Sequence, residues 1–213
     1  MKVTKYVHSC LLVESDDGRV GLIDPGVYSW ESGLIDLDSI GRLDDMVITH
    51  EHEDHMYLPF IKAVTAKFPD INIVTTKSAK KQLEDNGINN VKTEGGENVE
   101  LFSANHETLE PLFPPPENIG VHYIGKISHP GDSHHFEETK DVLAVPMTAP
   151  WGTVMRAAEL GEMLRPKFIV PIHDWHYKDE AKTAMYDWLE GFFSKMDISF
   201  LKPVDGKTID ISV

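Results

Sequence analysis

Short apolar runs alternate with turn residues along the N-terminal quarter of the chain, a pattern typical of β-strands. Three strands rich in valine, leucine and isoleucine are expected, at residues 3–7, 10–14 and 19–24. Asp16-Asp17-Gly18 forms a tight turn between the second and the third, and Asp24-Pro25-Gly26 ends the third. A fourth apolar strand, residues 46–49, leads directly into a segment rich in histidine.

Beyond residue 57 the periodicity becomes mixed, and helices are expected between further strands. Helical spacing is found in residues 58–68, 78–86 and 152–164, and again, most clearly, in the core-facing stripe Ala181, Ala184, Met185, Trp188, Leu189 and Phe192. Strands are expected at residues 71–75, 99–103, 119–124, 141–145, 168–172, 198–201 and 208–212. This order favours an α/β (α+β) fold in which two sheets bury their faces beneath outer helices.

Size and charge limit the classes to which the protein can belong. Its 213 residues, 41% of them apolar, are enough for one large core, so we expect a single domain spanning 1–213. Acidic residues outnumber basic ones by 35 to 20 and no basic stripe is present, which argues against a nucleic-acid partner. No export-type leader or run of about 18 apolar residues is found, so we expect a cytoplasmic protein with no membrane partner. Its single cysteine, Cys10, excludes an internal disulfide.

The strongest chemical signal is the segment His50-Glu51-His52-Glu53-Asp54-His55, which reads H-x-H-x-D-H. Imidazoles and carboxylates together suit zinc, manganese or iron. The two-residue spacing of His50 and His52 does not place them on one helix face, but it suits an extended loop that leaves a strand. Asp54 and His55 then turn the other way, which predicts two neighbouring cation positions.

Each of these positions needs at least three protein ligands if it also keeps an open site for catalysis. His106, which follows the strand at 99–103, could complete the first, and His173, which ends the strand at 168–172, could complete the second. Asp132 lies in the glycine turn Pro130-Gly131-Asp132-Ser133. A carboxylate there could bridge two ions held about 3.5–4 Å apart.

At these residues the chain resembles the metallo-β-lactamase-fold superfamily of metal-dependent hydrolases over nearly its whole length. The matching pieces are Leu22-Ile23-Asp24-Pro25-Gly26, Thr49 to His55, His106, Gly131-Asp132-Ser133 and Pro171-Ile172-His173. Within the superfamily, the opening His8-Ser9-Cys10 and the short length most resemble the branch that contains the L-ascorbate-6-phosphate lactonase. The resemblance implies a four-layer αββα sandwich with two metals at one edge of the sheets.

The resemblance also implies a role for each residue of the site. His50, His52 and His106 would bind the first metal, Asp54, His55 and His173 the second, and Asp132 would bridge them, while Asp24 would orient the histidine loop. A metal-bridging hydroxide would attack a small ester, lactone or phosphodiester. Asp54 could orient that hydroxide, and His8 could give a proton to the leaving group. Zinc is the first expectation for the metal and manganese the alternative.

Two divalent cations would outweigh the net charge of −15 locally, so a small anionic substrate is compatible with this chain. A homo-oligomer is compatible too, because relatives often self-associate. Another class of function is a metal-binding sensor or scaffold without efficient catalysis, and a redox role would need iron and a flavin partner.

The sequence leaves two possible roles open for several residues near the expected site. His8 either bonds backbone at a strand turn or faces the metals. His134 and His135 belong either to a solvated loop or to the substrate site, and Trp151 lines either a pocket or the core. Asp174 and His176 are expected at the rim of the pocket, and Glu51 and Glu53 as solvated or supporting residues.

Overall fold

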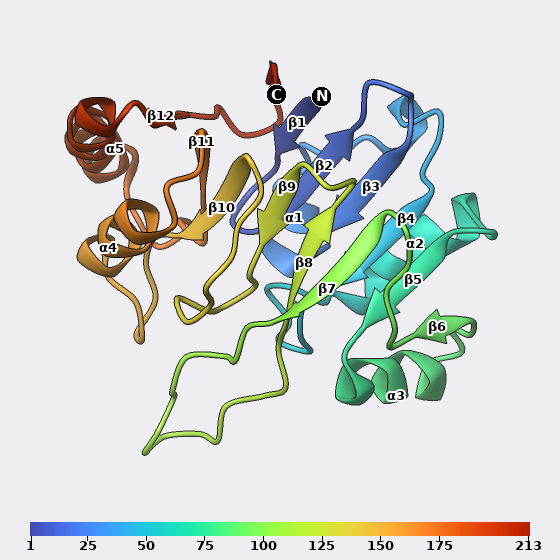
Figure 1. The fold of residues 1–213 in the computed structure, drawn as a ribbon. Helices are drawn as coiled ribbons and strands as arrows, with labels where there is room; N and C mark the ends of the chain where they lie inside the picture. The colour runs from blue at the N-terminus through green and yellow to red at the C-terminus, as the bar shows by residue number, and fades with distance from the viewer.

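Two β-sheets lie face to face between two layers of helices in a computed structural model that describes all residues 1–213 (Figure 1). The first sheet contains, in spatial order, β13 (Thr208–Asp210), β1 (Lys2–Lys5), β2 (Leu11–Glu14), β3 (Val20–Ile23), β4 (Asp45–Ile48), β5 (Asn72–Thr75) and β6 (Val91–Lys92). The second contains β12 (Ser199–Phe200), β11 (Phe168–Ile172), β10 (Val142–Pro146), β9 (Ile127–His129), β8 (Ile119–Tyr123) and β7 (Val99–Ser103).

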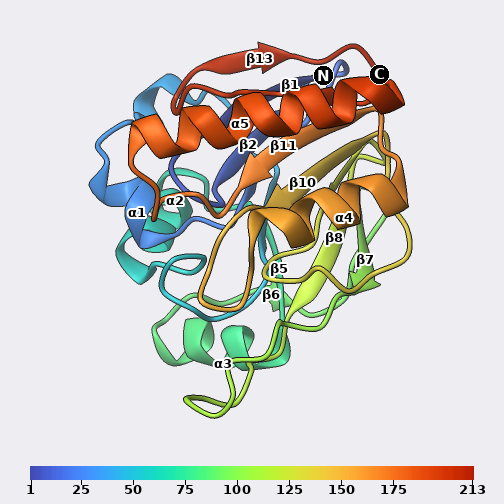
Figure 2. The same ribbon diagram turned by 90° about the vertical axis from the view of Figure 1, so that its left-hand side faces the viewer.

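Helices cover the outer face of each sheet. The first sheet carries α1 (Val27–Glu31), α2 (Leu58–Lys67) and α3 (Lys77–Asp85), and the second carries α4 (Val154–Leu164) and α5 (Asp179–Phe193). Figure 2 shows α4 and α5 lying across β10 and β11. Two short 3₁₀ helices, η1 (Leu37–Ser39) and η2 (Ser194–Met196), complete the elements.

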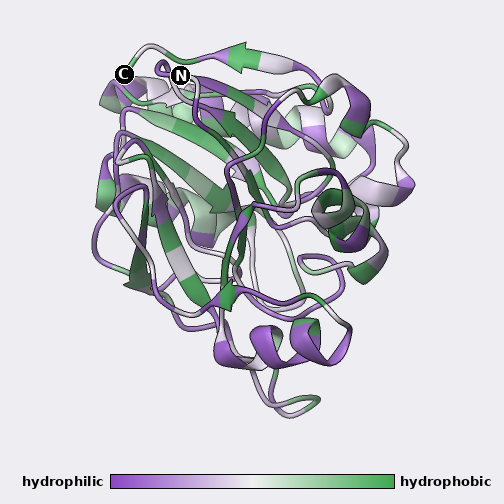
Figure 3. Cartoon of the chain, turned by 90° about the vertical axis from the view of Figure 1, so that its right-hand side faces the viewer, coloured by the Kyte–Doolittle hydropathy of each residue, from purple (hydrophilic) through white to green (hydrophobic).

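Three apolar clusters account for these four layers. A cluster of 18 buried residues lies between the first sheet and its helices, one of 16 between the two sheets, and one of 13 between the second sheet and α4 and α5. Figure 3 shows hydrophobic residues concentrated on the strands. Because both faces of each sheet are buried, the central strands are apolar almost throughout, as in Val142–Pro146. The expected αββα sandwich is confirmed.

Strand direction brings the ends of distant segments to one edge. Strands β1 and β3 both run antiparallel to β2, and β4 is parallel to β3. In the second sheet, β7 and β9 both run antiparallel to β8, and β10 and β11 are parallel to β9. Except for β2 and β8, these strands therefore have their carboxyl ends at the same edge of each sheet, which is where ligands usually bind in open sheets of this kind.

The expected elements are present, with differences at their ends. Helix α4 begins at Val154 instead of residue 152, because the Thr153 hydroxyl accepts a hydrogen bond from the Arg156 amide and caps the helix there. Three short elements, α1, β6 and β9, were not expected, because each is too short to show a clear periodicity in the sequence.

The buried face of α5 differs from the predicted stripe. Tyr186, Leu189 and Phe193 are the residues that face the core, whereas Trp188 is 72% exposed. The Tyr186 ring packs against Phe200 and its hydroxyl donates to a buried carboxylate of Asp174, so this phenol is satisfied inside the core. No helix combines the length and the apolar character that crossing a membrane requires.

Candidate metal centre

Six segments meet at the edge where the strands end. His8 follows β1, Asp24 follows β3, and the segment His50 to His55 follows β4. From the second sheet, His106 follows β7 and His173 follows β11, while Asp132 comes three residues after β9. All seven residues predicted as metal ligands are brought together here, and His8 joins them.

The first ligand group consists of His50, His52, His106 and Asp132. One nitrogen or oxygen from each lies within 4.8 Å of those of the others. His50 Nε2 is 3.1 Å from His52 Nδ1, and His106 Nε2 is 3.5 Å from Asp132 Oδ2. Three residues of this group are buried and His52 is half-buried, so the group forms a mostly buried polar site.

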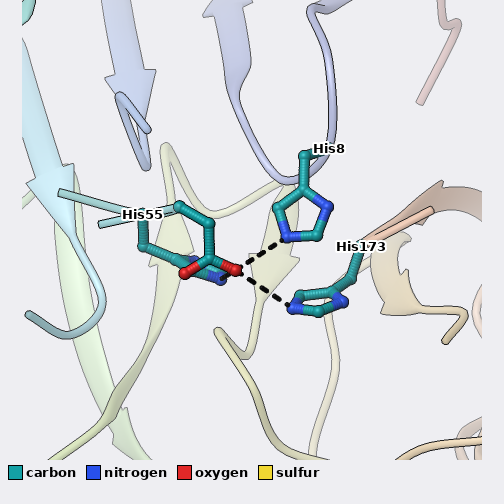
Figure 4. A group of neighbouring side chains, drawn as sticks. His8, His55 and His173 are labelled. Carbon is teal, nitrogen blue, oxygen red and sulfur yellow. Dashed lines mark hydrogen bonds and ion pairs between the residues drawn. The ribbon is translucent and has the colours of Figure 1, made fainter. Parts of the chain in front are cut away.

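The second ligand group consists of His8, Asp54, His55 and His173, with the same limit of 4.8 Å between their ligand atoms. The Asp54 Oδ2 atom is 3.1 Å from His8 Nε2 and 3.6 Å from His173 Nε2. Figure 4 shows the imidazoles of His8 and His173 directed toward one carboxylate, with His55 beside it. His8 therefore faces the site, and its interpretation as a residue that merely bonds backbone is not the one that the structure adopts.

Asp132 stands between the two groups. Its Oδ1 atom is 3.1 Å from His55 Nε2, and its Oδ2 atom is 3.3 Å from His173 Nε2 and 3.8 Å from His50 Nε2. A single buried carboxylate thus contacts imidazoles that belong to both groups. This arrangement is the one that a bridging ligand requires.

Hydrogen bonds from the far side of each ring fix which nitrogen faces the site. The Nδ1–H groups of His55, His106 and His173 donate to Asp24 Oδ2 at 2.7 Å, to the Glu107 carbonyl at 2.6 Å and to the Thr148 carbonyl at 2.6 Å. Each ring therefore directs Nε2 inward, as ligand histidines in metalloproteins do.

Asp24 supports both groups at once. It accepts the Nδ1–H of His55 directly, and its carboxylate also accepts the Thr49 amide at 2.8 Å and the Thr49 hydroxyl at 2.9 Å. The Thr49 hydroxyl in turn lies 3.1 Å from His50 Nδ1 and accepts its proton. The supporting role expected for Asp24 thus extends through Thr49 to the first group.

Unusual backbone conformations hold the ligands at these turns. His8, Asp24 and His173 all have positive φ, at 68°, 52° and 53°, in the left-handed region that non-glycine residues seldom occupy. A Cβ atom at Gly26 would lie only 1.7 Å from the Asp54 carbonyl oxygen, so glycine alone allows this close approach. Strain of this kind is typical of functional sites.

Burial and charge act in opposite directions on the protonation of these groups. Burial lowers the pKa of His50 well below its usual value and also lowers that of His52. At His55 burial has the same tendency, but the neighbouring carboxylates, Asp132 first, overcome it and raise the pKa well above its usual value. The pKa of His173 is raised for the same reason. The pKa of Asp132 is far below its usual range, because the charges of His173 and His55 outweigh its burial.

Four buried ligand-capable atoms in the two groups have no hydrogen-bond partner: His8 Nδ1, His55 Nε2, His106 Nε2 and Asp132 Oδ1. Buried polar atoms are normally paired, and leaving one unpaired costs about 1–3 kcal/mol. His55 Nε2, His106 Nε2 and Asp132 Oδ1 face the space shared by the two groups. This donor set of imidazoles and carboxylates fits divalent cations such as zinc or manganese.

The neighbours of the ligand groups resolve several open interpretations. The Trp151 ring lies 6.0 Å from the His106 ring and 5.1 Å from the His173 ring, centre to centre, so it borders both groups and is not a core residue. His134 is held by the Pro146 carbonyl, to which its Nε2–H donates at 2.9 Å, whereas His135 is exposed. Glu51 supports its loop by accepting the Ser78 hydroxyl at 2.6 Å.

The expectation that Asp174 lies at the pocket rim is wrong. Its carboxylate is buried and accepts the Lys5 ammonium at 2.9 Å and that of Lys182 at 2.7 Å. Lys5 is itself fully buried and also bonds Asp205 at 2.7 Å. This network joins β1, α5 and the end of β11 directly behind His173. A lysine inside the apolar run of β1 was the signal that could have indicated it, because such a charge needs a buried partner. His176 does lie at the exposed rim.

His129 is a supporting residue that the sequence did not indicate. Its Nε2–H donates to the Ser9 carbonyl at 3.1 Å, and its Nδ1 accepts the Gly131 amide at 3.2 Å. It therefore joins the turn that carries His8 to the turn that carries Asp132. A lone histidine at the end of a three-residue strand has no motif around it, so only the fold reveals this contact.

Comparison with known proteins gives a consistent result. A family model described as the β-lactamase superfamily domain matches residues 2–173. A UPF0173 protein of Pyrococcus furiosus is 30% identical over 218 residues, which cover 97% of this chain and 99% of that protein. A UPF0173 metal-dependent hydrolase of Ignicoccus hospitalis is 28% identical and covers 81% of this chain and 82% of its own length.

Among solved structures, the metallo hydrolase Igni18 of Ignicoccus hospitalis superposes with a TM-score of 0.71 and 19% identity. The match covers 99% of both chains. At this level of identity the likeness concerns the fold, and it agrees with the αββα layers described above. None of these matches selects the lactonase branch, which stays a prediction.

Proposed function

The chain belongs to the family of the β-lactamase superfamily domain, and from this premise we propose that it is a metal-dependent hydrolase with a dinuclear centre. Its substrate would be a small molecule with an ester, lactone or phosphodiester bond. The observation that carries the proposal is the set of unpaired buried atoms of His55, His106 and Asp132 directed at one space. Two cations would pair all of them.

The proposed ligands divide as the two groups do. His50, His52 and His106 hold the first cation, Asp54, His55 and His173 hold the second, and Asp132 bridges the two. The contacts of Asp132 with His55 and with His106, at 3.1 and 3.5 Å, support the bridging role. Zinc and manganese both suit this donor set.

When bound, the two cations would polarise the substrate and lower the pKa of a coordinated water from about 15.7 towards 7. In the overall reaction water adds to the acyl carbon or phosphorus, the bond to the leaving oxygen breaks, and that oxygen takes up a proton. The protein residues hold the reacting groups in place and need not form a covalent bond with the substrate. Trp151 borders both groups, and the burial of most of their residues strengthens each electrostatic contact.

His8 and Asp54 form a hydrogen-bonded pair beside the second group. The His8 Nε2–H donates to Asp54 Oδ2 at 3.1 Å, which fixes one carboxylate oxygen and leaves the other free. His8 is fully buried, and burial together with the charge of His173 lowers its pKa to about 4. A neutral His8 therefore orients Asp54 beside the second group. The leaving oxygen would take its proton from water, because a neutral imidazole that gave up its only N–H proton would become an imidazolate.

The test combines metal analysis with activity. The purified protein is expected to carry about two zinc or manganese ions per chain and to hydrolyse at least one of an ester, a lactone and a phosphodiester. Removal of the metal by a chelator should abolish turnover, and returning the metal should restore it. Two bound ions with no turnover across the panel would instead favour the sensor or scaffold function. A chain that binds no metal would contradict the proposal altogether.

A further inference from the structure

A cavity of about 770 Å³ lies next to Trp151, the residue that borders both ligand groups. Its walls come from the loop after β7, the loop after β9, Trp151 and one face of α4. This volume is in the range of small-molecule sites, which hold a ligand mostly through apolar contacts and a few polar ones. The position of the cavity makes it the natural place for the part of the substrate that does not react.

Trp151 connects the cavity to the ligand groups. Its ring lines the cavity and also lies within 6.0 Å of the His106 ring and 5.1 Å of the His173 ring. A molecule whose reactive bond sits between the two groups therefore reaches the cavity by passing along this indole.

One wall of the cavity is apolar. Phe136 and Leu160 are buried beneath it, and Met163 adds a side chain that is 60% exposed. Together with Trp151, these residues offer ring and aliphatic surface for an apolar group. Methionine adapts easily to ligands of different shape, so this wall suits an alkyl or aryl chain.

The charges of the cavity do not suit an anion. Arg156 is the only lysine or arginine in its lining, and its guanidinium already lies 3.4 Å from Glu159. Glu107 and Glu137 add two more carboxylates, so three carboxylates face one guanidinium, and the imidazole of His135 lies 3.3 Å from Glu107. His134 is the other histidine of the lining, and its Nε2–H already donates to the Pro146 carbonyl. Protein sites for phosphate normally present arginine or lysine directly to it, and this lining has no such group to spare.

We propose that the substrate is an uncharged ester or lactone whose apolar group occupies the cavity beyond Trp151, and not a phosphorylated or carboxylated molecule. The inference rests on the proposed hydrolase function and narrows its substrate class. It also replaces the expectation of an anionic substrate. That expectation was based on the charge of the two cations and not on the residues that line the cavity.

The experiment compares two esters that differ only in the terminal group, which is a methyl in one and a carboxylate in the other. The metal-loaded enzyme is assayed with p-nitrophenyl hexanoate and with the mono-p-nitrophenyl ester of adipic acid, which has the same reacting bond and the same chain length. Bis-p-nitrophenyl phosphate is the phosphodiester. We expect kcat/KM to be at least about tenfold higher for the hexanoate ester, a usual range for discrimination by an apolar pocket.

A pair of variants on α4 assigns this preference to the cavity. Met163→Lys places a cation in the lining and should reduce the preference about tenfold by improving turnover of the adipate ester. Met155→Lys is the matched control, because Met155 is 66% exposed on the same helix and does not line the cavity. That control should leave the preference unchanged.

The outcomes separate this inference from the function on which it rests. Metal-dependent turnover with equal or better use of the adipate ester or the phosphodiester would overturn the inference and leave the hydrolase function standing. An equal effect of Met163→Lys and Met155→Lys would also overturn it. If none of the three compounds nor a lactone were hydrolysed, the proposed function itself would fail.

Discussion

The two ligand groups are built from similar residues but are supported in different ways. The first contains three histidines and one carboxylate, and burial lowers the pKa of both His50 and His52. The second faces more negative charge, which raises the pKa of His55 and His173. In the first group His50 and His52 are therefore neutral donors, whereas protons compete for His55 and His173 in the second.

The residues that support the two groups from behind also differ. Behind the second group lie the fully buried Lys5 and the carboxylate of Asp174, bonded at 2.9 Å. The loop of the first group is held from behind by a bond between Glu51 and Ser78 that is only partly buried. Asp24 supports both groups, but only the second also has a buried ion-pair network directly behind one of its ligands.

The largest effect is expected where the two groups join. Asp132→Ala removes the carboxylate that contacts both, so both cations should bind at least about 100-fold more weakly, since changes behind the ligands alone cost 10–100-fold. Metal content per chain, measured by elemental analysis after dialysis, should fall for both positions. His106→Ala is the control and should weaken only the first. Unchanged metal content in Asp132→Ala would show that Asp132 does not bridge.

The buried support of the second group should contribute more to stability than the exposed support of the first. Asp174→Ala leaves Lys5 inside the core without one of its partners, which is expected to cost about 3–5 kcal/mol in the free energy of unfolding. Glu51→Ala removes a partly exposed hydrogen bond and should cost about 1 kcal/mol. Urea unfolding of the metal-loaded proteins measures both, and equal losses would contradict the comparison.

Asp24 tests whether the groups can be weakened separately. Asp24→Asn removes the charged acceptor of His55 Nδ1–H and weakens the contact through Thr49 to His50. We expect metal affinity to fall about 10–100-fold at the second position and by less at the first. Competition with a chromophoric chelator gives the two affinities. A larger loss at the first position would mean that the Thr49 contact, and not the direct one, carries the support.

The smallest expected effect is a difference in pH dependence. Metal binding requires neutral imidazoles, so affinity falls as pH drops below the pKa of each ligand, by about tenfold per pH unit for each proton that the metal must displace. His55 and His173, with raised pKa values, take up protons at a higher pH than His50 and His52. On acidification the second position should therefore release its cation first. Metal content is measured at stepwise lower pH. Loss of both ions at the same pH would contradict this order.

The sequence by itself determined most of the elements, the family and the residues of the candidate ligand set. The H-x-H-x-D-H segment follows a buried strand, and its residues are local, so their spacing alone predicted two cation positions. His106 and His173 could be added because each follows an expected strand, and Asp132 because it lies in a glycine turn of the matching family pattern.

Only the tertiary structure decided what surrounds that site. The contact of His8 with Asp54, the support that His129 gives to two turns, and the burial of Asp174 against Lys5 all join residues that are between 46 and 169 positions apart or lack any motif. The cavity wall likewise combines α4 with two loops from the second sheet. Local spacing in the sequence is enough to identify a ligand. Its burial and its charged neighbours depend on packing between distant segments. Burial and neighbouring charges set the protonation of the ligand, and the same packing sets the shape of the cavity beside it.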